Sequence, residues 1–565
     1  MPPTPHRSTA DSDRLRQSRH PATASRPPRS RRGSSRRSVR AGALAAAGLV
    51  LGAGLTACDS GTDDTSYGRG QIEKEEGIVV SSDFTEQQPS WRPCPAASVL
   101  QGADAGKPKP LPDGSRWECA DMKVPLDWSK QDGKKIDIAL IRVKAKDTKR
   151  RLGSLVFNFG GPGGSGVTGL PGSAASDYAT LHTRYDLVSF DPRGVGESQG
   201  VRCLDDKATE AADAIDATPD TPAEVRRSEA FGRRGNAACE KNSGAVLPHV
   251  DTESAARDMD LLRHVLGDKK LNYFGISYGT QLGGVYAHLF PERVGKAVFD
   301  AVVDPTSDPA DNAVGQAKGF DLALTNFLTL CAERSGRKCP TGPDPEQGKE
   351  RIVALLEKLD RRPLPTKDGR KVNESVAVSG MAQALYAKEL WDPLARGLAE
   401  AMSAGSGDTL LKLSDLMADR DEQGRYSNAN DANTAITCAD QKQRYTVEDV
   451  QDRLPALRKI SPVFGAFTGW QMLSCTDWPV DGTSDQTVAA PGSAPILVIG
   501  TTGDPATPYA GAKRMADRLG KGVAVNITNK GEGHGSYGVG TCVTKAVDAY
   551  LLNGKVPSDG LVCSS

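Results

Sequence analysis

The stretch Gly275-Ile276-Ser277-Tyr278-Gly279 decides the fold of this chain. It follows a short run of strand character at 271–274 and precedes a segment at 280–287 that can continue as a helix. A G-x-S-x-G pattern between a strand and a helix is typical of a nucleophile elbow, whose strained turn needs small residues on both sides of the serine. The pattern therefore predicts that Ser277 exposes its hydroxyl at the end of a sheet. A Gly-rich turn with an incidental serine is the alternative, because the bare pattern is common.

Predicted strands alternate with predicted helices on both sides of this turn. Apolar runs predict strands, and the spacing of apolar residues at 253–266 predicts a helix. The expected strands lie at 136–143, which we expect to be antiparallel, and at 155–159, 187–190, 297–303, 495–500 and 523–527. Repeated strand–helix units indicate a mostly parallel central sheet with helices on both faces, which is an α/β fold. The long segment between 303 and 495 is mainly helical in pattern and predicts a cap inserted over the sheet.

A glycine-rich loop follows the strand predicted at 155–159, with the sequence Gly160-Gly161-Pro162-Gly163-Gly164-Ser165-Gly166. Such a loop exposes backbone N–H groups, which can bind a tetrahedral oxyanion together with the N–H of Tyr278. A phosphate-binding loop is disfavoured, because the lysine of that motif is missing. The turn Asp191-Pro192-Arg193-Gly194 after the next strand is interpreted as architectural.

A serine nucleophile needs a general base, and an acid that orients the base. His534 is the only histidine after Ser277 apart from His288, which falls in the predicted helix. Asp504 follows the strand predicted at 495–500, so the chain order is serine, acid, histidine, which is the order expected in a fold with such an elbow. We therefore expect Ser277 as nucleophile, His534 as base and Asp504 as the acid that orients the base.

These motifs together resemble the α/β-hydrolase peptidases related to proline iminopeptidase, and most of all the secreted bacterial tripeptidyl aminopeptidases with a TAP-like C-terminal region. The resemblance spans about residue 90 to the C-terminus. It implies the α/β-hydrolase fold, Gly161 as the second oxyanion N–H, and release of short peptides from free N-termini. Phe159 stands where many relatives have a histidine, which leaves the backbone hole intact. We expect no cofactor, no metal and a monomer.

The N-terminus predicts export. Residues 1–57 are interpreted as a signal peptide of the lipoprotein type: a basic segment at 1–40 precedes an apolar run at 41–55 that is too short to span a membrane. The run ends in Leu55-Thr56-Ala57-Cys58, which resembles the bacterial lipobox. We expect a lipid on Cys58 and a location at the outer face of the bacterial membrane, or secretion. An ordinary cleaved signal remains open, as does twin-arginine export through Arg36-Arg37.

The cysteine count agrees with export to an oxidising compartment. Of 11 cysteines, Cys58 would carry lipid, which leaves an even number. We expect five bridges between sequence neighbours, although sequence alone does not fix connectivity. The pairs are Cys94 with Cys119, Cys203 with Cys239, Cys331 with Cys339, Cys438 with Cys475, and Cys542 with Cys563. No C-x-x-C pair occurs, so a zinc cluster is disfavoured.

The charges balance at 71 basic and 71 acidic residues, and nothing indicates a nucleic-acid partner. After the signal peptide, we expect a flexible tether at 58–90 and a hydrolase core at 91–304. We then expect a mainly helical cap at 305–490, and the rest of the core, with the TAP-like region, at 491–565.

An aminopeptidase has to bind a substrate ammonium, and a buried charge needs a carboxylate partner. We expect this carboxylate in the cap or in the segment that leads back to the sheet. Asp440 is the first candidate, because the Cys438–Cys475 bridge would hold it rigidly, and Asp477, tied by the same bridge, is the second. The alternative is that both are solvated loop carboxylates. An exported carboxylesterase or lipase would use the same triad. A non-catalytic solute-binding lipoprotein would share the anchor, but it would need no elbow, oxyanion hole and base.

Overall fold

The structure, a computed structural model, describes residues 80–102, 105–212, 215–483 and 486–564. The chain divides into two units, 1–76 and 77–565, and all described residues belong to the second. The predicted signal peptide, Cys58 and most of the tether therefore lie outside the described residues. Within the described ranges, no helix combines the length and apolar character needed to cross a membrane.

A single ten-stranded sheet forms the centre of the second unit, in the order β1-β2-β3-β5-β4-β6-β7-β10-β11-β12. The first three pairings in this order are antiparallel, and all the others are parallel. The prediction of a mostly parallel sheet is thus confirmed. The strands are β1 Arg92–Pro93, β2 Glu118–Pro125, β3 Lys135–Val143, β4 Gly153–Asn158, β5 Tyr185–Phe190, β6 Leu271–Ile276, β7 Val294–Asp300, β10 Ile496–Gly503, β11 Ala524–Glu532 and β12 Leu561–Ser564.

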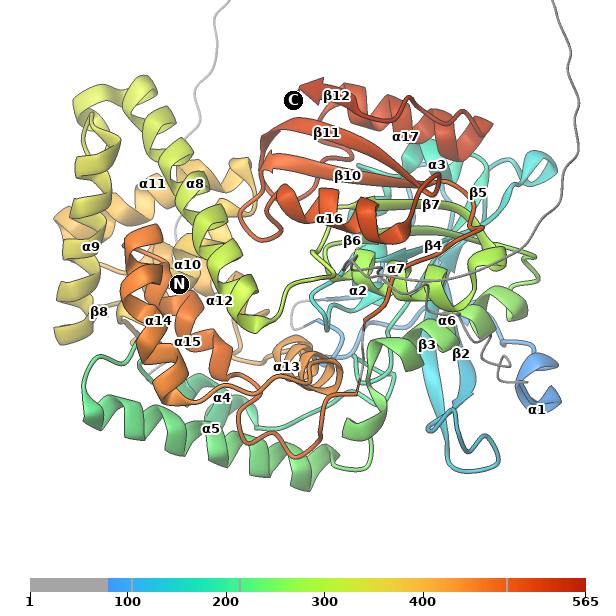
Figure 1. Ribbon diagram of the computed structural model, residues 1–565, viewed down its shortest axis with the longest axis horizontal. Helices are drawn as coiled ribbons and strands as arrows, with labels where there is room; N and C mark the ends of the chain where they lie inside the picture. The colour runs from blue at the N-terminus through green and yellow to red at the C-terminus, as the bar shows by residue number, and fades with distance from the viewer. Residues whose placement is uncertain (1–79, 103–104, 213–214, 484–485, 565) are drawn as a thin grey trace, which may run out of the picture. The chain divides into compact units, whose positions relative to one another are not determined.

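Helices cover both faces of this sheet (Figure 1). Side chains alternate along a strand, so Val156 of β4 packs toward one face while Leu155 and Phe157 pack toward the other. Strands buried on both faces have to be apolar at successive positions, which explains the short apolar runs in the sequence. The first face carries α6 Thr252–Val265, α7 Tyr278–Leu289 and α16 Ala510–Leu519, and the second carries α2 Gly166–Ala174, α3 Ala179–His182 and α17 Thr541–Asn553.

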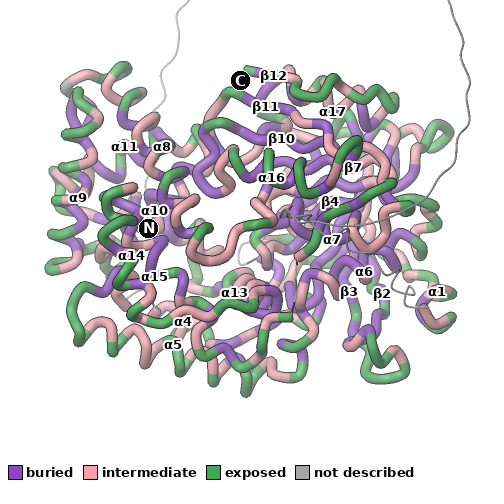
Figure 2. Tube along the Cα trace, in the orientation of Figure 1, coloured by how far each residue is buried: buried purple, intermediate pink, exposed green. Residues whose placement is uncertain are grey.

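The segment between β7 and β10 is mainly helical. Helices α8 to α12 enclose an apolar core of their own, separate from the two clusters at the sheet. Figure 2 shows purple, buried stretches in these helices beside green, exposed ones. The helices are α8 Pro309–Ser335, α9 Pro345–Arg361, α10 Glu374–Leu385, α11 Trp391–Ala399, α12 Asp408–Met417, α13 Ala429–Asp440, α14 Val447–Ile460 and α15 Gly465–Trp470; β8 Leu364–Pro365 and β9 Lys371–Val372 form a small ribbon.

Core and cap segments interleave at one side of the sheet. Helix α13 belongs to the expected cap by sequence, but its buried residues pack in the apolar cluster of α6 and α7. Helices α4 Asp206–Ala212 and α5 Pro222–Ser243, expected in the core segment, also bond to the cap, and Glu210 of α4 pairs with Arg420. Asn236 of α5 donates to the carbonyl of Thr476 at 2.9 Å. Cap and core are therefore joined through α13 as well as through α4 and α5.

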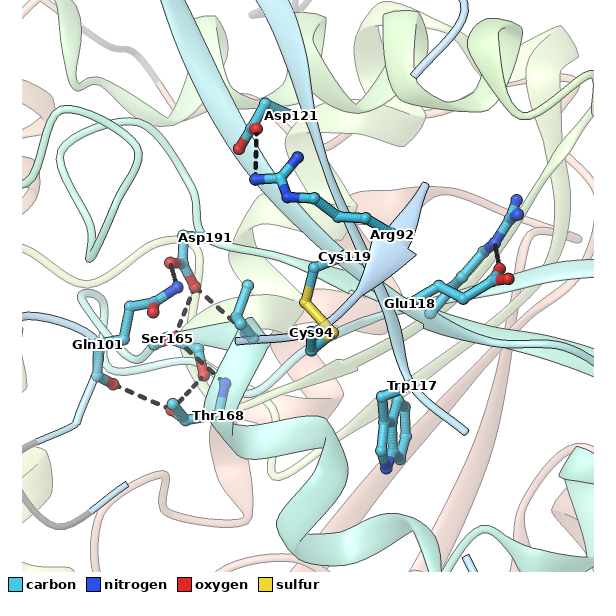
Figure 3. Close-up of a disulfide and its surroundings, with 12 residues drawn as sticks. Arg92, Cys94, Gln101, Trp117, Glu118, Cys119, Asp121, Ser165, Thr168 and Asp191 are labelled. Atoms are coloured by element: carbon cyan, nitrogen blue, oxygen red, sulfur yellow. Dashed lines mark hydrogen bonds and ion pairs between the residues drawn. A yellow bond between two sulfur atoms is a disulfide. The ribbon is translucent and has the colours of Figure 1, made fainter. Parts of the chain in front are cut away.

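The structure contains five disulfides, and they join the cysteine pairs expected as sequence neighbours. The Cys94–Cys119 bridge ties β1 to β2 (Figure 3). Figure 3 also shows the buried carboxylate of Asp191, which accepts hydrogen bonds from Ser165 at 2.6 Å and Gln101 at 2.8 Å. Asp191 thereby holds the start of α2, directly after the glycine-rich loop, which fits an architectural role.

Candidate active site

Ser277 occupies a tight turn between β6 and α7. Its backbone has φ of 57° and ψ of −127°, a conformation that costs free energy for a residue with a side chain. A Cβ added to Gly275 would lie 2.4 Å from the carbonyl oxygen of Gly279, which leaves no room for a larger residue. The spacing of small residues in the sequence is therefore explained by the crossing of β6 and α7.

Asp504 and His534 meet at the ends of two neighbouring strands. Asp504 directly follows β10, and His534 lies two residues beyond the end of β11. The His534 Nδ1–H donates to the Asp504 carboxylate, at 2.9 Å to Oδ1 and 3.0 Å to Oδ2. The carboxylate, 2% exposed, also accepts from the N–H of Ala506 and from the N–H and hydroxyl of Thr507. These bonds fix the carboxylate, so the histidine is held with Nε2 as its free acceptor.

The pKa of His534 lies above its ordinary value of 6.5. Burial lowers this pKa, but the charge of Asp504 and the hydrogen bond to it raise the pKa by more, and Asp300 adds to the increase. The imidazolium that a general base forms is thus stabilised in place. The ring of Tyr386 lies edge-on against the imidazole, with ring centroids 5.1 Å apart.

The glycine-rich loop lies against the elbow. A Cβ on Gly160 would lie 2.6 Å from the carbonyl oxygen of Ile276 and 2.8 Å from the Ser277 Cβ, so only glycine permits this approach. Gly160 itself has φ of 89°, which glycine adopts without strain. Within the described residues the N–H groups of Gly161 and Tyr278 have no hydrogen-bond partner, and both residues line the same cavity as Ser277. Two N–H donors are therefore available beside the serine.

The cavity over Ser277 has a volume of about 450 Å³ and is lined by both core and cap residues. Its walls are rich in carboxamide side chains, and the only aromatic residues among the described residues that line it are Tyr278 and Tyr386. Carboxamides both donate and accept hydrogen bonds, as peptide groups do. The carboxamides are Gln281, Asn312, Gln316, Asn433, Gln441, Gln471 and Gln486.

Gln281 of α7 is the most deeply buried of these carboxamides, with 3% of its surface exposed. Its Nε2 donates to the Oε1 of Gln486 at 2.8 Å, while its own Oε1 has no partner in the described part of the chain. A buried acceptor left unpaired costs about 1–3 kcal/mol. Because Gln281 lines the cavity, a donor on a bound substrate can satisfy this oxygen.

Asp440, predicted to bind the substrate amine, lines the cavity and is 3% exposed. Its carboxylate accepts from the N–H of Thr252 at 2.8 Å and from the Thr252 hydroxyl at 2.5 Å. The Thr252 hydroxyl also contacts the Tyr278 hydroxyl at 2.6 Å. Burial raises the pKa of Asp440 to about 7, although the bonds from Thr252 oppose the increase. Asp440 is thus linked to the residue that follows Ser277.

Asp477, the second predicted amine-binding residue, lies elsewhere. It is exposed, and it is not among the residues that line the cavity with Ser277. Asp440 and Asp477 each lie two residues after a cysteine of the Cys438–Cys475 bridge, but their side chains have different surroundings. The structure therefore offers Asp477 no place beside the elbow.

The structure brings Ser277, Gly161 and Tyr278 to one cavity and pairs Asp504 with His534 near Tyr386, which lines that cavity. Among the described residues, no hydrogen bond joins the Ser277 hydroxyl to His534 Nε2. Such contacts are often loose until substrate binds. Sequence reasoning missed Gln281, which helical spacing from Ser277 would have indicated, since residues four apart share a helix face.

One acidic group could hold a metal ion by its geometry. Asp216, Glu224 and Asp360 bring ligand oxygens within 4.8 Å of one another, and they are the one such group found in the described residues. None of them lines the cavity with Ser277. A metal bound there would not touch the reacting atoms.

Comparison with known proteins places this geometry in a family. The α/β-hydrolase fold model matches residues 154–337, and the TAP-like protein model matches residues 461–563. Serine protease Hip1 of Mycobacterium tuberculosis strain H37Rv is 37% identical over 499 residues, which cover 84% of this chain and 91% of the relative. Tripeptidyl aminopeptidase of Streptomyces lividans is 29% identical, covering 93% and 96%. Carboxylesterase B of the same mycobacterial strain is 34% identical, covering 79% and 86%.

The fold and the site define an α/β-hydrolase of the serine type. The chain belongs to the family of TAP-like α/β-hydrolases that includes the serine protease Hip1, and it is an enzyme of the serine peptidase class.

Proposed function

We propose that this protein is an exported serine aminopeptidase, which releases short peptides from the free N-termini of peptides or proteins. The observation that carries the proposal is the Asp504–His534 pair, which stands beside a polar cavity that contains Ser277 at a strained elbow. The S. lividans relative bears the name tripeptidyl aminopeptidase, which supports the same reaction for this chain.

The proposed chemistry is acyl transfer in two steps. Ser277 Oγ attacks the scissile carbonyl carbon, and His534 Nε2 takes the hydroxyl proton while Asp504 orients the ring. The tetrahedral oxyanion accepts hydrogen bonds from the N–H groups of Gly161 and Tyr278. The C–N bond then breaks, and the leaving amine takes the proton from His534. Water repeats the sequence on the acyl-enzyme, which frees the N-terminal fragment and restores Ser277.

The lining of the cavity favours a peptide over a lipid ester. An acyl chain would place apolar groups against seven carboxamides and gain little from their burial. A peptide offers N–H and C=O groups that these side chains can pair. The unpartnered Oε1 of Gln281 supports the same choice, because a simple ester has no N–H to donate to it.

Asp440 is proposed to bind the substrate ammonium. It is the one acid of the cavity that is both buried and without a cationic partner in the described residues, since Asp304 pairs with Arg514 and Asp311 is exposed. Asp251 and Glu253 raise the pKa of Asp440 further, so the surroundings of Asp440 are negative. An ammonium bound there would lower the pKa of Asp440 and favour its ionised form.

A panel of chromogenic peptides tests the proposal. We expect cleavage of peptides with a free N-terminus and no cleavage of the same peptides after N-acetylation, with slow hydrolysis of simple p-nitrophenyl esters. Asp440→Asn should lower kcat/KM for free peptides far more than for esters. Asp477→Asn is the matched control, because Asp477 is exposed beside the same disulfide, and it should leave both activities unchanged.

The carboxylesterase alternative rests on a specific relative, since a protein named carboxylesterase B is 34% identical to this chain. The same panel separates the two activities. Equal cleavage of free and acetylated peptides, or hydrolysis of esters alone, would favour an esterase or an endopeptidase. A solute-binding protein would bind peptides and turn over none of the substrates.

We further propose that the enzyme is a monomer held at the outer face of the bacterial membrane by a lipid on Cys58. The lipobox-like sequence carries this part of the proposal. Mass spectrometry of the membrane-fraction protein should find acylated Cys58 as the first residue, and Cys58→Ser should release the activity to the medium. Unmodified Cys58 in that fraction would contradict the anchor.

A further inference from the structure

Asp300, the last residue of β7, contacts both parts of the proposed catalytic apparatus. Its backbone carbonyl accepts the N–H of Ser277 at 3.0 Å. Its carboxylate accepts the N–H of Ser536 at 2.9 Å and that of Tyr537 at 2.8 Å, and these residues lie two and three positions after His534 in the chain. Strand β7 lies between β6 and β10, so one residue reaches both the elbow and the histidine loop.

The contacts of Asp300 are those of an ionised carboxylate. The side chain is 2% exposed, and its oxygens also accept the N–H of Ala301 at 2.9 Å. Burial raises the pKa of Asp300 above its ordinary value, and the three N–H bonds reduce but do not cancel this increase. A protonated carboxyl group would need an acceptor for its own O–H, but within the described residues both oxygens contact only N–H donors. A negative charge therefore lies behind the histidine loop.

We propose that Asp300 is a positioning residue for His534. Its backbone fixes the nucleophile, its side chain fixes the loop of the base, and its charge favours the imidazolium that forms when His534 takes the proton of Ser277. This inference rests on the proposed triad, but it does not depend on the substrate being a peptide.

In the described part of the chain, few titratable groups act on His534 and Asp300. His534 is acted on by the charges of Asp504 and Asp300, and the ring of Tyr386 lies against it. Asp300 in turn is near Asp504 and the buried phenol of Tyr178, whose pKa burial raises. Asp504 keeps its own hydrogen bonds to His534 when Asp300 is replaced. A neutral residue at position 300 therefore shows the effect of the Asp300 charge alone.

The test follows the reaction of Ser277 with a fluorophosphonate probe, in which Oγ displaces fluoride from phosphorus and His534 takes the proton. The rate constant is measured from about pH 5 to about pH 9, a range that spans histidine titration. Asp300→Asn keeps the shape and loses the charge. We expect the midpoint of the acidic limb to move to lower pH, and the plateau rate to fall by about 10-fold to 100-fold as the loop shifts.

Asp186→Asn is the matched control. Asp186 is also a buried carboxylate that accepts a backbone N–H, from Ala145 at 2.8 Å, but it lies in β5 and pairs with Arg151. Its loss should leave the midpoint unchanged. Asp300→Ser serves as a second neutral variant, and we expect the same direction of shift from it.

A folded Asp300→Asn or Asp300→Ser enzyme with the wild-type midpoint would overturn the proposal and leave the triad intact. Failure of both variants to fold would also count against it, because a positioning role requires the fold to survive loss of the charge. If wild-type Ser277 does not react with the probe, the proposed function and this inference both fail.

Discussion

The carboxylate of Asp440 lies against the N-terminus of α6 and accepts both the N–H and the hydroxyl of Thr252, at 2.8 Å and 2.5 Å. This contact joins the end of cap helix α13 to the core, and through Thr252 it reaches the Tyr278 hydroxyl beside the nucleophile. A change in the charge of Asp440 is therefore expected to affect both stability and the elbow.

The pKa of Asp440, about 7 in the folded protein, is above the ordinary value of 3.8. The folded state thus binds the proton more tightly than the unfolded state, so this contribution to stability is full below about pH 4 and is lost as pH rises through 7. Wild type should therefore lose stability relative to Asp440→Asn as pH rises over this range. Because each unit of pKa shift corresponds to about 1.4 kcal/mol, we expect the difference between their free energies of unfolding to fall by a few kcal/mol. Denaturant unfolding at several pH values measures it, and a constant difference would contradict a raised pKa.

Asp504→Asn should leave the fold intact and lower kcat by about 10⁴-fold, because the His534 ring loses the acceptor that fixes its tautomer. In the wild type, His534 has to be neutral to act as the base, and its pKa is raised. We therefore expect kcat/KM to rise with pH through a midpoint above 6.5. A midpoint below this value, measured with a free peptide, would argue against the paired carboxylate.

Gln281→Met should lower kcat/KM for peptides by about 10-fold to 100-fold, the cost of one hydrogen bond to a buried partner, and should spare simple esters. Gln316→Met is the matched control, since Gln316 lines the same cavity but is only half-buried, so water can satisfy its amide. Equal losses for peptides and esters in Gln281→Met would show that the side chain supports the cavity and does not read the substrate.

Removal of the Cys438–Cys475 bridge by alanine at both positions should cost about 4 kcal/mol of stability, because it closes a loop of 37 residues. The same change at Cys331–Cys339, which closes 8 residues, should cost about 2.5 kcal/mol. The first variant should also lose activity toward free peptides, because Cys438 lies two residues before Asp440. Calorimetry measures the loss of stability, and peptide assays measure the loss of activity. Equal activity in both variants would show that the Cys438–Cys475 bridge does not support the site.

Local patterns in the sequence were sufficient for much of this picture. The elbow could be predicted because the glycines around Ser277 are required by a crossing of adjacent elements, and the parallel sheet because its buried strands are continuously apolar. His534 could be chosen because histidines are scarce. The triad itself stays a prediction, and the signal peptide and Cys58 lie outside the described residues.

The features of the site that the sequence does not predict depend on contacts between distant segments. Asp300 and Ser536 are 236 residues apart, so no pattern along the chain could reveal their bond. The Cys438–Cys475 bridge predicts a fixed position for Asp477, but a disulfide fixes the backbone and not the direction in which a neighbouring side chain points. The position of helix α13 in the sequence predicts that it belongs to the cap, but its apolar residues pack against the core.

The most direct test of the account is labelling with a fluorophosphonate probe, followed by mass mapping and peptide turnover. We expect one modified residue, Ser277, and loss of cleavage of a free tripeptide substrate in proportion to labelling. Ser277→Ala should fold normally, resist the probe and lose several powers of ten in turnover. Near-normal turnover in folded Ser277→Ala, or modification of another serine that abolishes activity, would contradict the account.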